Sequence, residues 1–412
     1  MGLKTGYKQT EAGMIPEEWE CTTARDIASP VRNAIVGGPF GSDLVSNDYV
    51  EDGVPVLRGQ NMGHRFVSGS FAFVTRAKAS SLGANLARPG DLVFTQRGTL
   101  GQVSLVPDSP YDRYLVSQSQ MKITVNRRAA DPLFLYYVFS SAEQQEFIRQ
   151  NTIQTGVPHI NLGVLRSIPV KRPSLAEQEA IAEALSDADA LIESLGQLLA
   201  KKRHLKQGAM QELLTRKKRL PGFSGEWEVK SLGDICEISM GRTPPRLNSN
   251  YWGKGYKWLS IADLRTKVVT ESQEEITELA AAELRVIPKG TLLMSFKLSI
   301  GRLCFAGCDL YTNEAICSFN RLRANADFLY YVLGWTDFSL YGKQAVKGYT
   351  LNSESLKLVE VHLPSEAEQT AIAAVLSDID AEIDALEAKL AKASQLKQGM
   401  MQELLTGRIR LV

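Results

Sequence analysis

Two long stretches of the chain carry hydrophobic residues at spacings that alternate between four and three. Each stretch begins just after a proline, Pro173 or Pro364, and continues without another proline to a Leu-Leu-Thr sequence. A period of about 3.5 residues is typical of a coiled-coil helix, whereas a helix lying on its own domain would carry a wider apolar stripe. We therefore expect two paired helices with these seam residues: Ile181, Leu185, Ala188, Ile192, Leu195 and Leu199, and Ile372, Leu376, Ile379, Ile383, Leu386 and Leu390.

A capping signal precedes each predicted helix. Ser174 and Ser365 can cap the first turn, and Glu177 and Glu368, three residues further on, would complete a capping box. A helix from Ser174 to Leu214 would be roughly 60 Å long. Two such helices in a tandem arrangement would pair most simply as an antiparallel coiled coil, with a globular unit held at each end.

The two stretches are also copies of one another. Leu205–Thr215 reads LKQGAMQELLT and Leu396–Thr406 reads LKQGMMQELLT. At the same offset, EQEAIAEALSDADA (Glu177–Ala190) matches EQTAIAAVLSDIDA (Glu368–Ala381), and FLYYV occurs once before each stretch. A repeat of such long period predicts two similar structural units in one polypeptide.

Length and composition are those of a globular protein with more than one domain. A chain of 412 residues suggests two or three domains of roughly 150 residues each. The hydrophobic share of 44% and the charged share of 23% are ordinary. No apolar run approaches the roughly 20 residues of a membrane span, and no signal peptide is evident, so we expect a cytoplasmic protein. The predicted division is 1–172 and 218–363 for the globular domains, and 173–217 and 364–412 for the helices.

Motifs for catalysis and metal binding are missing from the sequence. It contains no GxxxxGK[ST] phosphate loop, no HExxH and no CxxC pair, and its four histidines are dispersed. The formal net charge of +1 gives no global signal for nucleic acid. Basic residues do gather at 201–206 and 216–219, where they are either a solvated helix end or contacts for phosphate groups.

Short strand-like runs in both globular parts end in polar residues. Examples are VPVLRGQN (Val54–Asn61) and LVFTQRGTLG (Leu92–Gly101) in the first part, and KWLSIAD (Lys257–Asp263) and LLMSFKLSIG (Leu292–Gly301) in the second. Arg, Gln, Asn, Lys and Ser are the side chains that read base edges and bind phosphates. Polar loop residues are more often simply solvated, but here they stand at matching points of both parts.

These motifs together resemble the specificity (S) subunit of type I restriction-modification systems, over almost the whole chain. The resemblance is strongest in PSLAEQEAIAEALSDADALI (Pro173–Ile192), in PSEAEQTAIAAVLSDIDAEI (Pro364–Ile383) and in the two LKQGxMQELLT segments. GGPFGSDL, VPVLRGQN and TGVPHINL look like landmarks of a first target-recognition domain, and MGRTPP and KWLSIADL like those of a second.

The resemblance implies an α+β fold in which two target-recognition domains, each with a mixed sheet and helices, are separated by the two long helices. Each domain would read one half of a split, asymmetric site in double-stranded DNA. Two modification (methyltransferase) subunits would dock on the chain, and restriction subunits would join the full complex. The chain itself would catalyse nothing. It would bind no cofactor or metal, because S-adenosylmethionine, ATP and Mg belong to the partner subunits, and it would contact no membrane.

We expect loop and strand-end residues of both domains to enter the major groove. The expected DNA-binding residues are Arg58, Gln60, Asn61, Arg97, Thr99, Gln118, Gln120 and Asn161 in the first domain, and Arg242, Thr243, Ser260, Asp263, Lys297, Asn313, Tyr349 and Asn352 in the second.

We expect the partner subunits to bind the polar helix faces, for example at Glu179, Glu183, Gln369 and Gln395, together with the repeated helix ends. Two alternatives of other classes remain at this point. One is a scaffold whose repeated domains bind protein or glycan, and the other is a DNA-modifying enzyme that acts alone.

Overall fold

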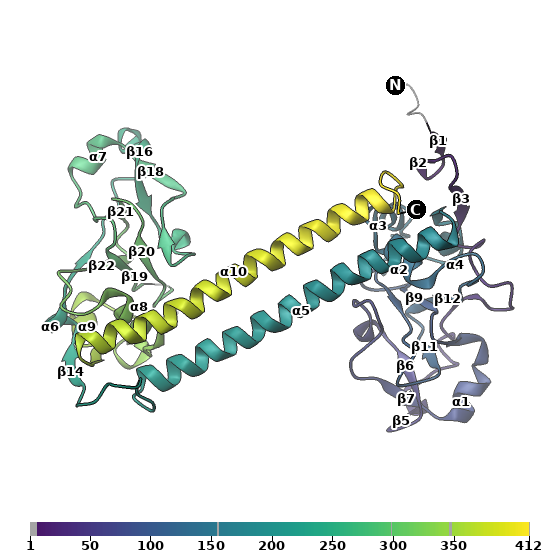
Figure 1. Cartoon of the computed structure of the whole chain (residues 1–412), viewed down its shortest axis with the longest axis horizontal. Coiled ribbons are helices and arrows are strands. Elements are labelled where there is room, and N and C mark those ends of the chain that lie inside the picture. The colour runs from purple at the N-terminus through teal and green to yellow at the C-terminus, as the bar shows by residue number, and fades with distance from the viewer. Residues whose placement is uncertain (1–5, 155, 298, 346–347, 412) are drawn as a thin grey trace. The chain divides into compact units, whose positions relative to one another are not determined.

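The computed structural model describes residues 6–154, 156–297, 299–345 and 348–411, and of residues 343–345 and 348–350 it gives only the backbone. The chain forms two compact units (Figure 1). Unit 1 comprises Met1–Gly196 together with Lys389–Val412, and unit 2 comprises Gln197–Ala388. Each of the two long helices, α5 (Leu175–Leu214) and α10 (Glu366–Leu404), is therefore divided between the units.

Unit 1 contains two larger sheets. One is antiparallel, in the order β10-β9-β12-β4, and the other is mixed, in the order β5-β7-β6-β11-β8, with β6 parallel to β11. Two further strand pairs are β1-β2 and β3-β13. The strands are β1 (Tyr7–Thr10), β2 (Gly13–Pro16), β3 (Glu20–Thr23), β4 (Ile35–Gly37), β5 (Tyr49–Val50), β6 (Val54–Leu57), β7 (Ala72–Val74), β8 (Leu86–Ala87), β9 (Leu92–Thr95), β10 (Val103–Leu105), β11 (Tyr114–Val116), β12 (Gln120–Ile123) and β13 (Pro169–Arg172).

Unit 2 repeats this plan with changes. Its larger sheet has the order β15-β22-β19-β20-β17, so β15, β22, β19 and β20 correspond to β4, β12, β9 and β10. Its second sheet has the order β18-β16-β21, in which β16 runs parallel to β21 as β6 does to β11. The strands are β14 (Glu228–Ser231), β15 (Glu237–Met240), β16 (Trp252–Leu259), β17 (Val268–Val269), β18 (Glu274–Ile276), β19 (Leu292–Ser295), β20 (Leu303–Ala306), β21 (Tyr311–Thr312), β22 (Ile316–Asn320), β23 (Lys343–Ala345), β24 (Gly348–Thr350) and β25 (Glu360–Leu363).

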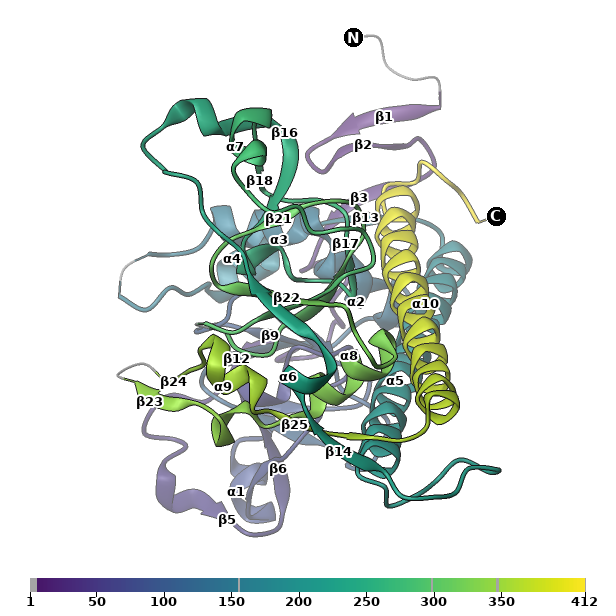
Figure 2. The same ribbon diagram turned by 90° about the vertical axis from the view of Figure 1, so that its left-hand side faces the viewer.

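The FLYYV sequence forms a buried helix in each unit. α2 begins after Asp131, whose carboxylate accepts a hydrogen bond from Phe134 N at 2.7 Å, and α8 begins after Asn325, whose side chain accepts one from Phe328 N at 2.9 Å. These caps satisfy amides that lack helical partners. In unit 2, α8 lies beside α10 (Figure 2). The shorter helices are α1 (Arg76–Ser81), α2 (Pro132–Ser140), α3 (Ala142–Gln150), α4 (Leu162–Ser167), α6 (Leu232–Ile235), α7 (Glu278–Ala282), α8 (Ala326–Trp335) and α9 (Ser353–Lys357).

α5 and α10 pair antiparallel within each unit, as the sequence predicted (Figure 1). In unit 1 the Asp189 carboxylate lies 2.5 Å from Lys397 Nζ. In unit 2 the Asp380 carboxylate lies 2.5 Å from Lys206 Nζ, and Arg203 donates to Glu387 at 2.7 Å. All twelve predicted seam residues are buried or half-buried, so the apolar stripe lies on the covered side of both helices.

The core of each unit includes a helix end from the far part of the sequence. In unit 1, Ile181 and Leu185 of α5 pack in the same cluster as Leu404 and Leu405 near the end of α10. In unit 2 the end of α5 enters the core with the beginning of α10, through this set: Leu213, Leu214, Ile372 and Leu376. Burying such side chains is worth about 1.5–3 kcal/mol each. The helix ends are therefore parts of the globular cores.

Candidate nucleic-acid interface

Several strand ends meet at one place in unit 1. Gly38 N donates to Gln120 O at 2.9 Å, Ser117 N donates to Leu57 O at 3.0 Å, and Gln96 N donates to Ser119 O at 2.7 Å. These bonds join the ends of β4, β6 and β9 to the connection between β11 and β12. We call residues 38–44, 58–61, 96–99 and 117–120 the first strand-end cluster.

Unit 2 has an equivalent arrangement. Gly241 N donates to Ile316 O, Asn313 N donates to Leu259 O, and Phe296 N donates to Ala315 O, each at 3.0 Å. These bonds join the ends of β15, β16 and β19 to the connection between β21 and β22. Residues 241–243, 260–263, 296–297 and 313–315 form the second strand-end cluster. Because the same three bonds recur, the residues beside these bonds can be matched between the two clusters.

A glycine is required by space in each cluster. A Cβ added to Gly38 would lie 1.8 Å from Ser117 O, and one added to Gly241 would lie 2.2 Å from Thr312 Oγ1 and 2.3 Å from Asn313 O. Neither glycine has a positive φ, so close approach of two chain segments is what excludes a side chain. Gly38 of GGPFG and Gly241 of MGRTPP thus allow the two chain segments of each cluster to lie this close together.

The predicted DNA-binding residues divide by exposure. Those exposed at the clusters are Gln60, Arg97, Thr99, Gln118, Arg242 and Lys297. Those half-buried are Arg58, Thr243, Ser260, Asp263 and Asn313. Two are buried, Asn61 at 1% exposed and Gln120 at 0%. The Gln120 amide oxygen accepts from the Ser117 hydroxyl inside the protein. The side chains of Asn61 and Gln120 are therefore not accessible to a duplex in this structure.

Asn61 and Asp263 shape the turn that follows the parallel strand of each unit. Asn61 Oδ1 accepts from Arg58 N at 3.1 Å, and Asn61 Nδ2 donates to Ser68 O and Ser70 O at 3.0 Å. Asp263 Oδ2 accepts from Ser260 N at 2.8 Å in the same manner. Sequence reasoning missed this role because Ser68 and Ser70, whose carbonyls accept from the Asn61 amide, approach Asn61 only in the folded chain.

Asn161 and Asn352 are exposed and cap short helices. Asn161 Oδ1 accepts from Val164 N at 2.9 Å, and Asn352 Oδ1 accepts from Ser355 N at 2.8 Å. Ile160 N donates to Gln96 O at 3.1 Å, which brings the segment before α4 to the first strand-end cluster. Tyr349 lies in β24, and its side chain is outside the described part of the structure.

The backbone of Arg242 is hydrogen-bonded through both its N–H and its carbonyl. Its N–H donates to Thr312 O at 2.9 Å, and its carbonyl accepts from Trp258 Nε1 at 3.2 Å. The next residue, Thr243, donates its hydroxyl to Glu314. Glu314 is exposed and was missed by sequence reasoning, although it occupies the position that Gln118 occupies in unit 1.

The repeated helices carry two matched polar clusters. In unit 1, Arg410 forms a bidentate ion pair with the fully buried Glu177, which also accepts from Trp19 Nε1 at 3.1 Å. In unit 2, Arg219 forms a bidentate pair with Glu368. The serine half of each predicted capping box is present, since Glu177 N and Glu368 N donate to the preceding serine hydroxyls. The glutamate half is not, because both carboxylates face an arginine instead.

The second matched cluster joins a tyrosine, an aspartate and a lysine. Tyr137 donates to Asp189 at 2.8 Å in unit 1, and Tyr331 donates to Asp380 at 2.7 Å in unit 2. Burial raises the pKa of both tyrosines, and the neighbouring aspartates add to the effect. Gln369, which we expected to face solvent, is buried and accepts from Asn325 N at 2.9 Å, so that expectation was wrong.

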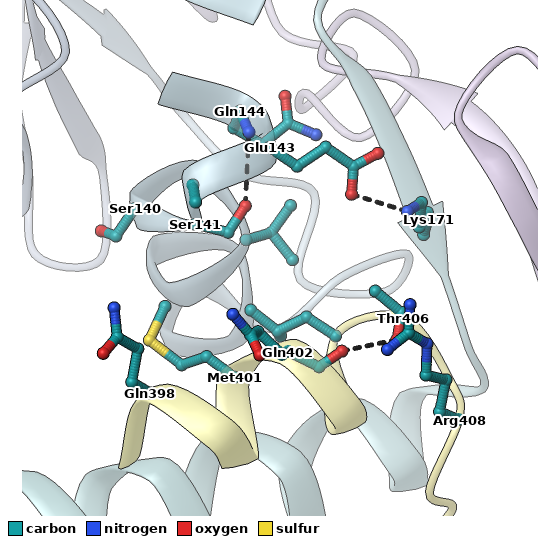
Figure 3. A pocket seen from close by; sticks show the side chains of 13 residues that line it. Ser140, Ser141, Glu143, Gln144, Lys171, Gln398, Met401, Gln402, Thr406 and Arg408 are labelled. Atoms are coloured by element: carbon teal, nitrogen blue, oxygen red, sulfur yellow. Dashed lines mark hydrogen bonds and ion pairs between the residues drawn. The ribbon is translucent and has the colours of Figure 1, made fainter. Parts of the chain in front are cut away.

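A groove runs beside the repeated helix end in unit 1 (Figure 3). It has a volume of about 590 Å³ and lies between α10, the α2–α3 corner and β13. Met401, Gln402 and Gln398 approach from α10, and Lys171 pairs with Glu143 on the other side at 2.6 Å. A smaller groove of about 280 Å³ occupies the matching place in unit 2, lined by Leu214, Thr215, Arg216, Val332, Trp335 and His362.

The described residues hold no group of three or more His, Cys, Asp or Glu side chains placed to bind a metal ion. None of the helices in the described part of the chain has the length and hydrophobicity needed to span a bilayer.

Two related α+β units, with polar strand ends at matching positions and paired long helices, define a duplicated recognition protein. The chain belongs to the family described as type I restriction modification DNA specificity domain, whose model matches residues 60–201 and 224–395. Membership confirms the expected class, since specificity subunits recognise DNA and are not the catalytic components.

Similar proteins align with this chain over nearly its whole length. A putative type I restriction enzyme MjaX specificity subunit from Methanocaldococcus jannaschii is 24% identical over 98% of this chain and 97% of its own. The type I restriction enzyme MjaVIII specificity subunit from the same organism is 22% identical over 98% and 96%. The crystal structure of a type I restriction-modification S subunit from M. genitalium has a TM-score of 0.62 at 16% identity, covering 98% of both chains. The last shows the shared fold.

Proposed function

We propose that each strand-end cluster reads one half of a bipartite, asymmetric duplex site. The observation that carries this proposal is the convergence of exposed polar side chains at equivalent strand ends of both units. The side chains differ, with Arg97 and Gln118 in unit 1 where unit 2 has Lys297 and Glu314. Two different sets of readers on one scaffold would recognise two different half-sites. The buried Asn61 and Gln120 are not among the proposed contacts.

Replacing Arg242 with alanine is expected to cost about 1–3 kcal/mol of DNA binding and to relax one base position. The reason is that an arginine on a fixed backbone can donate two hydrogen bonds to guanine. Binding to a set of duplexes that differ at single positions measures the effect. The matched control is Arg321→Ala, which removes an exposed arginine at the other end of β22. A loss of affinity that is equal for all duplexes would assign Arg242 to a phosphate instead.

We further propose that two methyltransferase subunits dock on the repeated helix ends. Many side chains of each repeat make contacts inside their own unit. Lys206 and Lys397 form ion pairs there, and the pairs Leu213–Leu214 and Leu404–Leu405 lie in the cores. Exposed Leu205 and Leu396 are not in the cores, and a Cβ added to the glycine three residues later in either copy, Gly208 or Gly399, would meet nothing within 4 Å. A glycine inside a helix costs roughly 1 kcal/mol relative to alanine. The presence of this glycine in both copies, despite its cost, therefore supports the proposal that another molecule approaches the helix closely at Gly208 and Gly399.

Changing Leu205 and Leu396 together to lysine is expected to abolish co-purification with the methyltransferase subunit while leaving the chain folded. The two side chains are 52% and 62% exposed, so the substitutions add charge only to the proposed docking face. Leu191→Lys is the matched control, because Leu191 is equally exposed on α5 but has Glu382 at the matching position of α10. Removing residues 396–412 would be a poor test, since Leu404, Leu405 and Arg410 belong to unit 1. Unchanged co-purification of the double variant would contradict this docking face.

The same proposal places S-adenosylmethionine, ATP and Mg on the partner subunits, with the restriction subunits joining through the methyltransferases. It places the chain in the cytoplasm, where its duplex and its partners are. A scaffold that binds protein or glycan is the competing function, and sequence-specific binding to double-stranded DNA separates the two.

A further inference from the structure

The second strand-end cluster contains a carboxylate where the first contains an amide. Ser117 and Asn313 make the same backbone hydrogen bond to the end of the parallel strand, so the residues that follow them, Gln118 and Glu314, occupy equivalent positions. Both are exposed. The two units therefore present different hydrogen-bonding groups from the same place in the fold.

The Glu314 carboxylate is fixed and charged. The Thr243 hydroxyl donates to Glu314 Oε2. Thr243 directly follows Arg242, whose backbone N–H and carbonyl are both hydrogen-bonded. The hydrogen bond from Thr243 holds the pKa of Glu314 below its usual range, and the nearby charges of Lys297 and Arg246 lower it further. A carboxylate offers about four lone-pair directions, so one bond from Thr243 leaves acceptor capacity for another molecule.

A carboxylate facing DNA is repelled by the phosphates, so its presence needs a compensating donor. In the major groove, cytosine N4 and adenine N6 are donors, while guanine O6 and thymine O4 are acceptors. A carboxylate only accepts, and it therefore favours the first pair of bases and opposes the second. Gln118 Nε2 donates to Leu44 O at 3.2 Å and to Gly41 O at 3.4 Å, so Gln118 presents an uncharged amide oxygen where Glu314 presents a carboxylate.

We propose that Glu314 reads the exocyclic amino group of a cytosine or an adenine in the half-site bound by unit 2. This inference rests on the proposed function. It adds a specificity-determining residue to the second unit and assigns the chemical class of the base that it contacts.

Glu314→Gln is the test, made in the full chain, alone and co-expressed with its methyltransferase subunit. The probe is a library of duplexes with a randomised central segment, from which bound molecules are sequenced. The wild-type chain is expected to select cytosine or adenine at one position, and the two bases are told apart by the selected sequences. In the variant, discrimination at that position should fall by about 5- to 150-fold, which corresponds to about 1–3 kcal/mol, while the other positions keep their preference.

Glu226→Gln is the matched control, because it removes the same charge from an exposed site of unit 2 outside the cluster. Thermal unfolding of each variant verifies that it is folded. If Glu314→Gln leaves every position unchanged, or raises affinity equally for all duplexes, the inference fails while the site selected by the wild type still supports the proposed function. If the wild-type chain selects no site in either form, the proposed function itself fails.

Discussion

Replacing Arg410 with alanine is expected to destabilise unit 1 by about 3–5 kcal/mol, because Glu177 would then keep a buried charge without its cation. The Glu177 side chain is 0% exposed, and Arg410 Nη2 lies 2.8 Å from its Oε2. Trp19 Nε1 supplies a neutral donor to the same carboxylate, which is too little to replace the lost ion pair. Denaturant unfolding of the full chain, followed by circular dichroism, measures the loss.

The control for Arg410→Ala is Arg408→Ala two residues earlier. Arg408 pairs with Glu403 at 3.3 Å, with the two side chains 62% and 36% exposed, so its loss should cost no more than about 1 kcal/mol. Arg219→Ala should repeat the large effect in unit 2, since Glu368 is buried there in the same way. A double variant, Arg410→Ala with Glu177→Gln, should recover part of the stability by removing the buried charge. Equal effects of the Arg410 and Arg408 substitutions would refute the stabilising role of the cluster.

Gly38→Ala is expected to abolish sequence preference in the half-site of unit 1 and to cost about 1–3 kcal/mol of stability. The added Cβ would lie 1.8 Å from Ser117 O and 2.7 Å from Gln118 N, so the two segments must separate. Separation breaks the bond from Gly38 N to Gln120 O and moves Gln118. Preference in the other half-site should remain, because the second strand-end cluster is unchanged. Selection from a randomised duplex library, with thermal unfolding alongside, measures both effects.

Gly41→Ala in the same loop is the control for Gly38→Ala. A Cβ at Gly41 would meet nothing within 4 Å, and its φ is not positive, so the substitution is expected to be neutral or slightly stabilising. Gly241→Ala should remove preference in the half-site of unit 2 in the same way. If Gly38→Ala retains full preference in both half-sites, the first strand-end cluster is not the reading surface.

The long helices could be predicted because their pattern is local. The spacing of residues such as Ile181, Leu185 and Ile192 along one helix already indicates which side of that helix is covered. The repeat likewise predicted two units of one design, and the glycine-rich turns marked the strand ends.

The burial and the hydrogen-bond partners of individual polar residues could not be predicted from the sequence, because they depend on groups that are distant along the chain. Asn61 and Gln369 look like surface amides in sequence, yet each is buried by groups that only the fold brings near. Glu177 was expected to cap its own helix, but Arg410, far along the chain, takes its carboxylate. Glu314 became visible only when backbone hydrogen bonds matched its position to Gln118.

The division of the long helices between units sets an order for folding during synthesis. Unit 1 contains residues 389–411, which leave the ribosome after all of unit 2 has been made. Until then Glu177 lacks the Arg410 cation, and the core of unit 1 lacks Leu404 and Leu405. The first unit to be translated is therefore the last to be completed, and a nascent chain interrupted before Leu404 would present an unfinished core to chaperones and proteases.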